Sequence, residues 1–108
     1  MSPVEIVIGL DEDSTGPGAS YSTIAGSTIR LAVDLVNADG GINGKPVRLV
    51  VENDESSPTK TPSIIRKLVD HGASAVLLAT GSGSVIQAKS VLQQSEIPAI
   101  APVVLSDA

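Results

Sequence analysis

The sequence predicts one α/β domain of three layers, with a parallel four-stranded sheet between helices, and two observations support this prediction. Four short apolar segments alternate with three segments of helical spacing, which is typical of parallel strands joined by crossover helices. The apolar residues are almost all aliphatic, with no Phe or Trp and one Tyr, and such residues suit strands buried on both faces. The length of 108 residues fits a single domain, residues 1–108, and is too short for two lobes.

The first part of the chain predicts a strand, a helix and a second strand. An apolar run indicates the first strand over Val4–Leu10. Helical spacing predicts a helix over Ser20–Ala38, which Gly40 and Gly41 then end. The second strand is expected over Pro46–Glu52. One face of the predicted helix carries Ile24, Thr28, Leu31, Ala32, Leu35 and Val36.

The second helix has a clear end, near His71, but two possible beginnings. Both Ser57-Pro58 and Thr61-Pro62 resemble an N-cap followed by Pro at the first helical position. Pro62 fits poorly inside a helix that begins at Pro58, because it lacks the N–H group that such a helix needs. The residues expected to face inward are Ile64, Ile65, Leu68 and Val69.

The last part predicts a strand, a helix and a strand. The strands are expected over Ser74–Ala79 and Ile97–Val104, and the helix between them opens at Gly81–Ser84. The first crossover goes one way and the later two go the other, so the predicted strand order is 2-1-3-4. One face of the third helix is expected to carry Val85, Ala88, Val91 and Leu92.

The loop Thr80–Ser84 is the best candidate for a binding site, because ligands of open parallel sheets bind beyond the carboxyl ends of the strands. Its glycines allow close backbone approach, and Ser82 or Ser84 could cap the following helix, whose N–H groups favour an anion. A carboxylate would fit as well as a phosphate. A tight strand-to-helix turn without a ligand explains the same residues equally well. The glycine pair is no dinucleotide fingerprint, because Ile86 stands where a third Gly belongs.

Acidic residues follow the first two predicted strands. Asp11, Glu12 and Asp13 come after the first strand, and Asp54 comes after the second. Clustered carboxylates can hold Mg²⁺ or Ca²⁺, and they also suggest a phospho-receiver domain. That family carries its phosphorylated Asp after the third strand, where this chain has Thr80. We therefore favour a solvated acidic loop and predict no metal site.

Composition and residue placement exclude several other functions. A net charge of −5, without a basic stripe, argues against binding to nucleic acid. The chain has no Cys, no apolar run long enough to span a bilayer, and no visible signal peptide. The only His, His71, is expected at the opposite end of the sheet from Ser82, so no base could activate that hydroxyl. The chain is therefore not expected to be an enzyme.

Several segments match a known family in order and spacing. The most specific is Asn37–Pro46, which reads NADGGINGKP. The others are Thr15–Tyr21, Leu31–Val36, Val50–Asp54, Pro58–Lys60, Arg66–Val69, Gly81–Ser84 and Ile97–Pro102. They resemble the N-terminal lobe of the branched-chain amino-acid-binding proteins of ABC transporters, which have the type I periplasmic binding fold. The resemblance covers nearly the whole chain but only part of one lobe, so a fragment with a flavodoxin-like half-lobe is expected.

The resemblance implies a set of ligand contacts. Ser82, between Gly81 and Gly83, matches the family Ser whose hydroxyl and N–H hold the ligand carboxylate. Tyr21 matches an aromatic residue of the pocket wall. Val103 matches a position whose carbonyl accepts the ligand ammonium group.

One position departs from the family. Leu105 stands where amino-acid binders usually carry a Thr that contacts the ligand. Because Leu cannot form those hydrogen bonds, either Ser106 substitutes through a shift of one residue, or the ligand lacks an α-amino group.

The resemblance also implies a function and partners. The parent protein would bind a small carboxylate such as a branched-chain amino acid or an organic acid, without a cofactor. It would lie in the periplasm or outside the cytoplasm and deliver its ligand to the membrane permease of an ABC transporter. A flavodoxin- or receiver-like signalling or cofactor domain is the alternative, and it predicts a response to Mg²⁺ or phosphate at Asp11, Asp13 and Asp54.

The predicted fourth strand indicates self-association. It is apolar throughout and lies at an edge of the 2-1-3-4 order, although Pro98 and Pro102 remove two of its donors. We therefore expect a homodimer, through this strand and its flanking helix or by exchange of the C-terminal segment. A marginal monomer is the alternative, because a small aliphatic core gives little stability.

Overall fold

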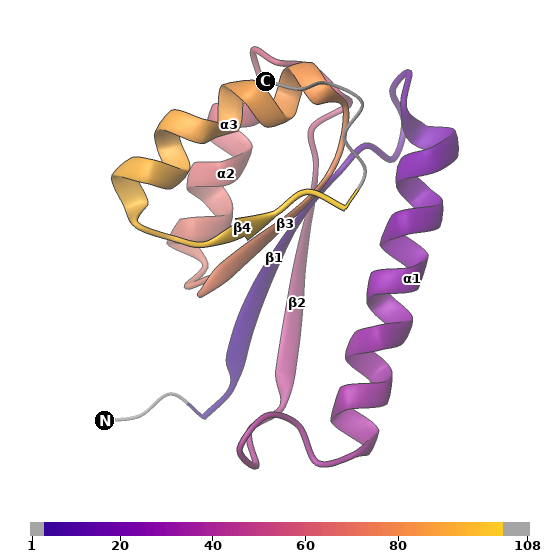
Figure 1. Ribbon diagram of the computed structural model, residues 1–108, viewed down its shortest axis with the longest axis vertical. Coiled ribbons are helices and arrows are strands. Elements are labelled where there is room, and N and C mark those ends of the chain that lie inside the picture. The colour runs from indigo at the N-terminus through magenta and orange to yellow at the C-terminus, as the bar shows by residue number, and fades with distance from the viewer. Residues whose placement is uncertain (1–3, 103–108) are drawn as a thin grey trace.

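The helices and strands follow one another in the predicted alternating order (Figure 1). The computed structural model describes residues 4–102. No helix in this range is long and apolar enough to cross a membrane. The elements are β1 (Ile6–Glu12), α1 (Ala19–Ala38), β2 (Val47–Asn53), α2 (Thr61–Asp70), β3 (Ala75–Ala79), α3 (Ser82–Ser95) and β4 (Ala99–Ile100).

The four strands form one parallel sheet in the order β2-β1-β3-β4, which confirms the predicted topology. In the register of the central strand, Ile8 lies between Leu49 of β2 and Ala75 of β3. Strand β2 lies on one side of β1, and β3 followed by β4 lies on the other side. The loops that follow β1 and β3 are therefore neighbours at the carboxyl end of the sheet.

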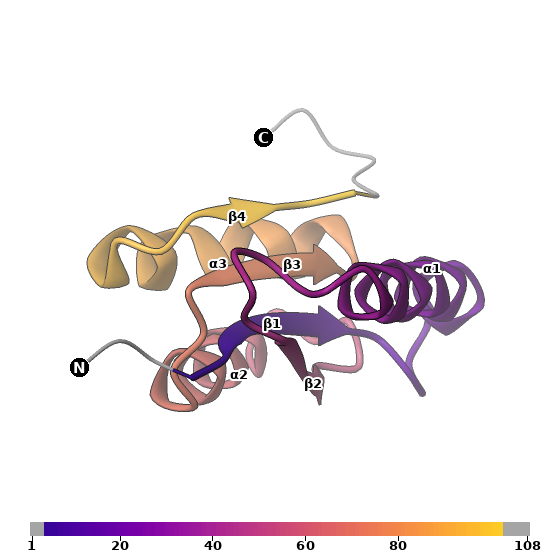
Figure 2. The same cartoon turned by 90° about the horizontal axis from the view of Figure 1, so that it is seen from below.

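Helices cover the two faces of the sheet unequally (Figure 2). Helices α2 and α3 pack on one face, and among residues 4–102 only α1 lies on the other. The core lies under the pair and includes the fully buried Ile65, Leu68 and Val76. Gly9 of β1 allows α2 to approach closely, because a Cβ at this position would lie 3.1 Å from the Leu68 Cβ. The inward faces predicted for the second and third helices are confirmed except at Ile64, which is only partly buried and lies outside this core.

The connection from α1 to β2 requires particular residues at two positions, Asn37 and Gly41. The Asn37 side chain donates to the Val47 carbonyl oxygen (2.9 Å) and accepts from the Val47 N–H (2.8 Å), which joins the end of α1 to the start of β2. Gly41 adopts a φ of +78°, and a Cβ there would meet the Lys45 carbonyl oxygen at 2.0 Å. A residue with a side chain would break this turn.

Helix α1 and strands β2 and β3 differ from the predicted bounds by one residue, and β1, α2 and β4 need a fuller account. The first strand begins at Ile6 and extends to Glu12, because the backbone of the acidic residues pairs with β2 and β3. Helix α2 begins at Thr61, the second of the two possible starts, with Pro62 in its first turn. Strand β4 comprises Ala99–Ile100 within the described range, while the last part of the predicted Ile97–Val104 lies outside it.

The apolar face predicted for the first helix does not pack on the sheet. Ile24, Leu31 and Leu35 are 68%, 58% and 62% exposed. The buried residues of α1 are Ser22 and Gly26, which lie on the opposite side of the helix. Ser22 and Gly26 are small, so this part of α1 lies close to the sheet. The larger Ile24, Leu31 and Leu35 point outward.

Candidate ligand-binding site

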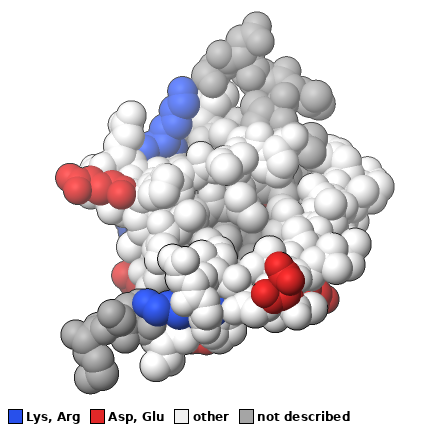
Figure 3. All heavy atoms as spheres, turned by 60° about the horizontal axis from the view of Figure 1, so that its bottom comes forward, with Lys and Arg blue, Asp and Glu red and all other residues white. Residues whose placement is uncertain are grey.

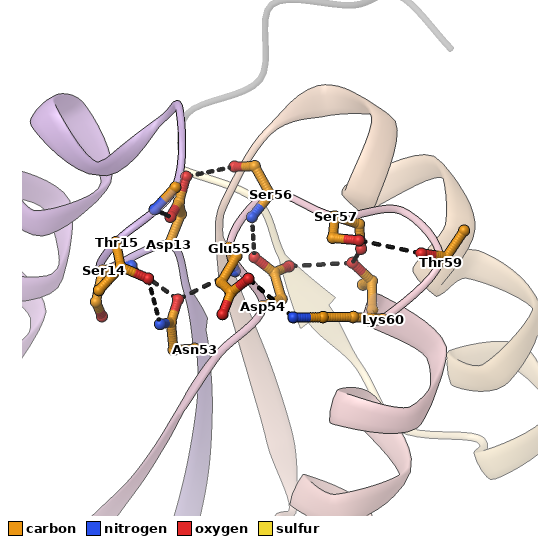
Figure 4. A network of polar contacts seen from close by, with 12 residues as sticks. Asp13, Ser14, Thr15, Asn53, Asp54, Glu55, Ser56, Ser57, Thr59 and Lys60 are labelled. Atoms are coloured by element: carbon orange, nitrogen blue, oxygen red, sulfur yellow. Dashed lines mark hydrogen bonds and ion pairs between the residues drawn. The ribbon is translucent and has the colours of Figure 1, made fainter.

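Three loops meet at the carboxyl end of the sheet, and a network of polar contacts joins them. Figure 4 shows the part of this network between the first two loops. The three loops follow β1, β2 and β3. Figure 4 shows Asp13 of the first loop facing Ser56 of the second, with Asp54 beneath. The network holds the loops in a fixed relation to one another, and its centres are the buried carboxyl groups.

Asp13 organises the loop between β1 and α1. One carboxylate oxygen accepts from the Gly16 N–H (2.5 Å), and the other accepts from the Gly18 N–H (2.7 Å) and the Ser56 hydroxyl (2.8 Å). The backbone N–H of Asp13 donates to the Ser22 hydroxyl (2.8 Å), which in turn donates to the Ala79 carbonyl oxygen. Burial by itself would raise the pKa of Asp13, but the hydrogen bonds outweigh it, and the pKa lies below its usual value.

Asp54 joins the loop after β2 to two other segments. One carboxylate oxygen accepts from the Thr80 hydroxyl (2.7 Å) and the Ser56 N–H (2.8 Å). The other lies 3.1 Å from the Thr61 hydroxyl at the start of α2. Asp54, Thr61 and Thr80 have no exposed surface, so this arrangement is part of the interior.

Asp11 lies in the same interior without a donor of its own. It is fully buried, and neither carboxyl oxygen accepts a hydrogen bond from residues 4–102. Burial, the Asp54 carboxylate as an acceptor for the proton of Asp11, and the negative charges of Asp54 and Asp13 raise the pKa of Asp11 to about 10. Asp11 is therefore protonated at neutral pH, and in this form its hydroxyl can donate to Asp54.

Glu12 points to the other face of the sheet, towards α1. It forms a two-armed ion pair with the Arg30 guanidinium, at 3.0 Å and 3.2 Å, and accepts from the Ser14 hydroxyl (2.7 Å). The Glu12 side chain is 5% exposed and that of Arg30 is 45% exposed. This pair fixes the middle of α1 against the end of β1.

The prediction of a solvated acidic loop is therefore wrong. Asp11, Glu12, Asp13 and Asp54 are all buried. The partners of Asp13 and Asp54 are hydroxyl and N–H groups of serine, threonine and glycine residues, and Glu12 pairs with Arg30; sequence reasoning did not connect these donors with the acids. No group of acidic or histidine side chains in the part of the chain that is described has an arrangement suited to a metal ion. The oxygens of Asp13 and Asp54 are already occupied by donors.

The loop after β3 brings two predicted contact residues together. A Cβ added at Gly81 would lie 3.9 Å from the Tyr21 hydroxyl and 3.2 Å from the Ser56 hydroxyl oxygen. The Gly81 N–H donates to that same Ser56 oxygen (3.2 Å). Tyr21 is 36% exposed, so it lies at the open end of the sheet rather than in the core.

Helix α3 begins at Ser82, and no side chain caps it. Gly81 occupies the N-cap position, so neither Ser82 nor Ser84 has the predicted capping role. Ser82 is half-buried and Gly83 is exposed. Ser84 is buried, and its hydroxyl has no hydrogen-bond partner among the described residues. The first turn of a helix presents backbone N–H groups that lack carbonyl partners within the helix, which suits an anion.

Two predicted contacts, Val103 and Leu105, lie outside the described residues, as does Ser106. His71 is exposed at the end of α2, where its N–H donates to the Lys67 carbonyl oxygen. This is the end of the sheet away from Ser82, as predicted.

The candidate site is open rather than enclosed. Two hollows among the described residues lie elsewhere. One, of about 520 Å³, is at the carboxyl end of α3 and the start of β4, and the other, of about 340 Å³, is on the face that carries α1. Neither is lined by Tyr21 or by the first turn of α3.

Comparison with known proteins identifies relatives of this arrangement. A 99-residue match at 34% identity links the chain to an amino acid binding protein of Pseudomonas aeruginosa, covering 91% of the chain and 26% of the relative. A 102-residue match at 31% identity links it to a Leu/Ile/Val-binding protein of Rhizobium johnstonii, covering 94% and 28%. The chain therefore spans about a quarter of the length of these curated relatives.

Solved structures share the fold over the same part. The branched-chain amino acid transporter substrate-binding protein LivJ of Streptococcus pneumoniae, solved with isoleucine, superposes with a TM-score of 0.92 at 31% identity. This match covers 96% of the present chain and 30% of LivJ. A type 1 periplasmic binding protein of Bordetella pertussis gives 0.86 at 27% identity, over 94% and 28%. The family model for periplasmic binding proteins matches residues 5–108, and the chain belongs to this family.

Proposed function

We propose that the chain contributes the carboxylate-binding part of a substrate-binding protein that serves an ABC transporter. The observation that carries this proposal is the position of the first turn of α3 at the open end of the sheet, beside Tyr21. Backbone N–H groups there suit a carboxylate, and the Ser82 hydroxyl adds a further donor.

A branched-chain amino acid or a similar small organic acid is the proposed ligand class. The relatives named for leucine, isoleucine and valine support this class, as does the solved relative in complex with isoleucine. In a longer parent protein, the partner would be the membrane permease, and the location would be the periplasm or another extracytoplasmic space. The buried carboxyl groups of Asp13 and Asp54 have structural partners and give no support to a receiver-like or cofactor-binding role.

The proposal predicts weak binding by the 108-residue chain. Enclosed sites cover most of the surface of a ligand, whereas this end of the sheet leaves it in solvent. We expect a Kd of about 1 mM or weaker for isoleucine, which corresponds to about −4 kcal/mol. Amide chemical-shift changes measured by NMR during titration should cluster at Tyr21 and Gly81–Ser84.

Two controls make the test specific for the carboxylate. Isoleucinamide lacks the carboxylate and should produce no clustered shift changes. The substitution Ser82→Ala should weaken isoleucine binding, whereas Ser90→Ala, at an exposed position on the same helix, should not. An equal response to the amide, or shift changes elsewhere in the chain, would contradict the proposal. Submicromolar binding would show that the chain encloses the ligand instead of leaving much of its surface in solvent.

A further inference from the structure

Ser56 is the point at which the loops after β1, β2 and β3 are joined. Its hydroxyl donates to the Asp13 carboxylate of the first loop (2.8 Å) and accepts from the Gly81 N–H of the third (3.2 Å). The ionised carboxylate can only accept, so the single proton of this hydroxyl goes to Asp13 and its oxygen remains for Gly81. Thr80 lies 3.4 Å from the same oxygen, but its own proton goes to Asp54 over 2.7 Å.

The backbone at Ser56 has an uncommon conformation. Glu55 and Ser56 have φ angles of +57° and +51°, in the left-handed region that residues with a side chain rarely adopt. The other residues of this kind among residues 4–102 have ordinary positions, Asn43 in a turn and Glu96 at the end of α3. Such a conformation persists where surrounding contacts hold it, and it is concentrated at functional sites. Here the Ser56 N–H donates to the Asp54 carboxylate (2.8 Å).

The contacts of Ser56 connect the two parts of the candidate site. The Asp13 oxygen that accepts from Ser56 also accepts from the Gly18 N–H (2.7 Å), and a Cβ at Gly18 would lie 2.6 Å from the Tyr21 hydroxyl. On the other side, Gly81 is the N-cap of α3, so its position determines that of the first turn. One hydroxyl group therefore sets the first turn of α3 relative to the loop beside Tyr21.

We propose that Ser56 is a positioning residue of the carboxylate site, whose hydroxyl holds the first turn of α3 in place relative to Tyr21. This inference rests on the function proposed above. The effect of Ser56 on a ligand passes through the Gly81 N–H and the Asp13 carboxylate. Donors that are held in place before a ligand arrives bind it more tightly, because less conformational freedom is lost on binding.

The first measurement compares variants without ligand by NMR. Ser56→Ala removes the hydroxyl and keeps a side chain at the left-handed position, whereas Ser56→Gly removes it and relaxes the backbone. In both variants the Gly81 amide should exchange with solvent about three- to tenfold faster, because its acceptor is lost. The matched control Glu55→Gly relaxes the adjacent left-handed residue, whose side chain pairs with Lys60 at the surface. It should leave the exchange of Gly81 unchanged.

The second measurement is the NMR titration with isoleucine. The Kd should rise by about three- to tenfold in both Ser56 variants, whereas Glu55→Gly should match wild type. The urea midpoint of Ser56→Gly should stay near that of wild type, because the relaxed backbone offsets the lost hydrogen bond. Weaker binding at equal stability distinguishes a positioning role from a purely structural one.

The outcomes separate this inference from the proposed function. If wild type binds isoleucine and both Ser56 variants keep its Kd, the positioning role is wrong, whatever happens to the exchange of Gly81. Normal binding by Ser56→Gly alone would also contradict it, because the backbone conformation rather than the hydroxyl would then matter. A wild-type chain without clustered shift changes would overturn the proposed function, and this inference with it.

Discussion

At the scale of single residues, the buried acids show how burial and hydrogen bonding determine charge. Asp13 and Asp11 are two residues apart, and both are fully buried. Asp13 receives several N–H and hydroxyl donors and has a lowered pKa, whereas Asp11 receives none and has a raised one. Residues of the same type in one strand and its following loop therefore have opposite protonation states at neutral pH.

The substitution Asp11→Asn should flatten the pH dependence of stability. The folded pKa of Asp11, about 10, exceeds the ordinary value of 3.8. Folding therefore retains a proton that the unfolded chain releases, so the stability linked to this group is complete below about pH 4 and decreases as pH rises towards 10. The variant should be more stable than wild type at pH 8 by about 1 kcal/mol or more, and the difference should vanish near pH 4.

Urea unfolding at several pH values would measure this effect. The control Asp70→Asn changes an exposed carboxylate at the end of α2 and should leave the wild-type slope unchanged. Equal slopes for Asp11→Asn and wild type would show that Asp11 is not held as a neutral acid.

The Thr80 hydroxyl should be important for stability, although the sequence gives it no evident role. It is buried and donates to Asp54 over 2.7 Å. The substitution Thr80→Val keeps the shape but removes this donor to a charged group, so we expect a loss of about 1.5–3 kcal/mol in the free energy of unfolding. Thr59→Val, at an exposed position, should change it by less than about 0.5 kcal/mol. Similar stabilities for the two variants in urea unfolding would be incompatible with this account.

At the scale of elements, the contact between α1 and β1 depends on a small residue inside a helix. Gly26 lies in the middle of α1 and is buried against the end of β1. A Cβ there would lie 1.9 Å from the Glu12 Oε1 atom and 2.9 Å from Arg30 Nη1. The helix is therefore close to the ion pair because this residue has no side chain.

The substitution Gly26→Ala should destabilise the chain, although alanine usually strengthens a helix by about 1 kcal/mol relative to glycine. Glu12 is buried and held by Arg30 and Ser14, so its carboxylate cannot move without losing these contacts. We expect a net loss of about 1–2 kcal/mol, measured by chemical unfolding. The neighbouring control Ser27→Ala is exposed and should be neutral or slightly stabilising. A gain in stability for Gly26→Ala would mean that the ion pair readily moves aside.

At the scale of the whole molecule, helices cover the two faces of the sheet unequally. One face has a closed core under α2 and α3, while the other leaves an apolar groove of about 340 Å³ and the outward row of α1 (Ile24, Leu31 and Leu35) in solvent. Figure 3 shows an uncharged, hollowed surface in the middle of one side of the molecule, with the charged side chains around it. The first turn of α3, at the carboxyl end of the sheet, does not line the apolar groove.

The homodimer expected from the edge strand β4 predicts that thermal unfolding depends on protein concentration. Association that occurs only in the folded state stabilises it by mass action, by about 2.7 kcal/mol per dimer for a hundredfold rise in concentration. Calorimetric melting temperatures should rise accordingly. A transition that does not move with concentration would indicate a monomer.

The sequence by itself determined the element order, the parallel sheet and the strand order. Apolar segments of strand and helix length alternate, and the handedness of crossover connections restricts how such segments can be arranged. It also predicted the inward faces of the second and third helices, apart from Ile64, and the position of His71. These features depend on local spacing, and the family resemblance was equally readable from short segments such as Asn37–Pro46.

Only the tertiary structure decided which acids are buried and which side of α1 faces the sheet. Asp11, Asp13 and Asp54 read as loop residues because their partners, Ser56, Thr80 and the backbone of the first loop, are brought near only by folding. Likewise, the apolar row of α1 was evident in the sequence, but its direction was not. Small residues allow the opposite side of the helix to approach the sheet, because close packing depends on shape as well as on hydrophobicity.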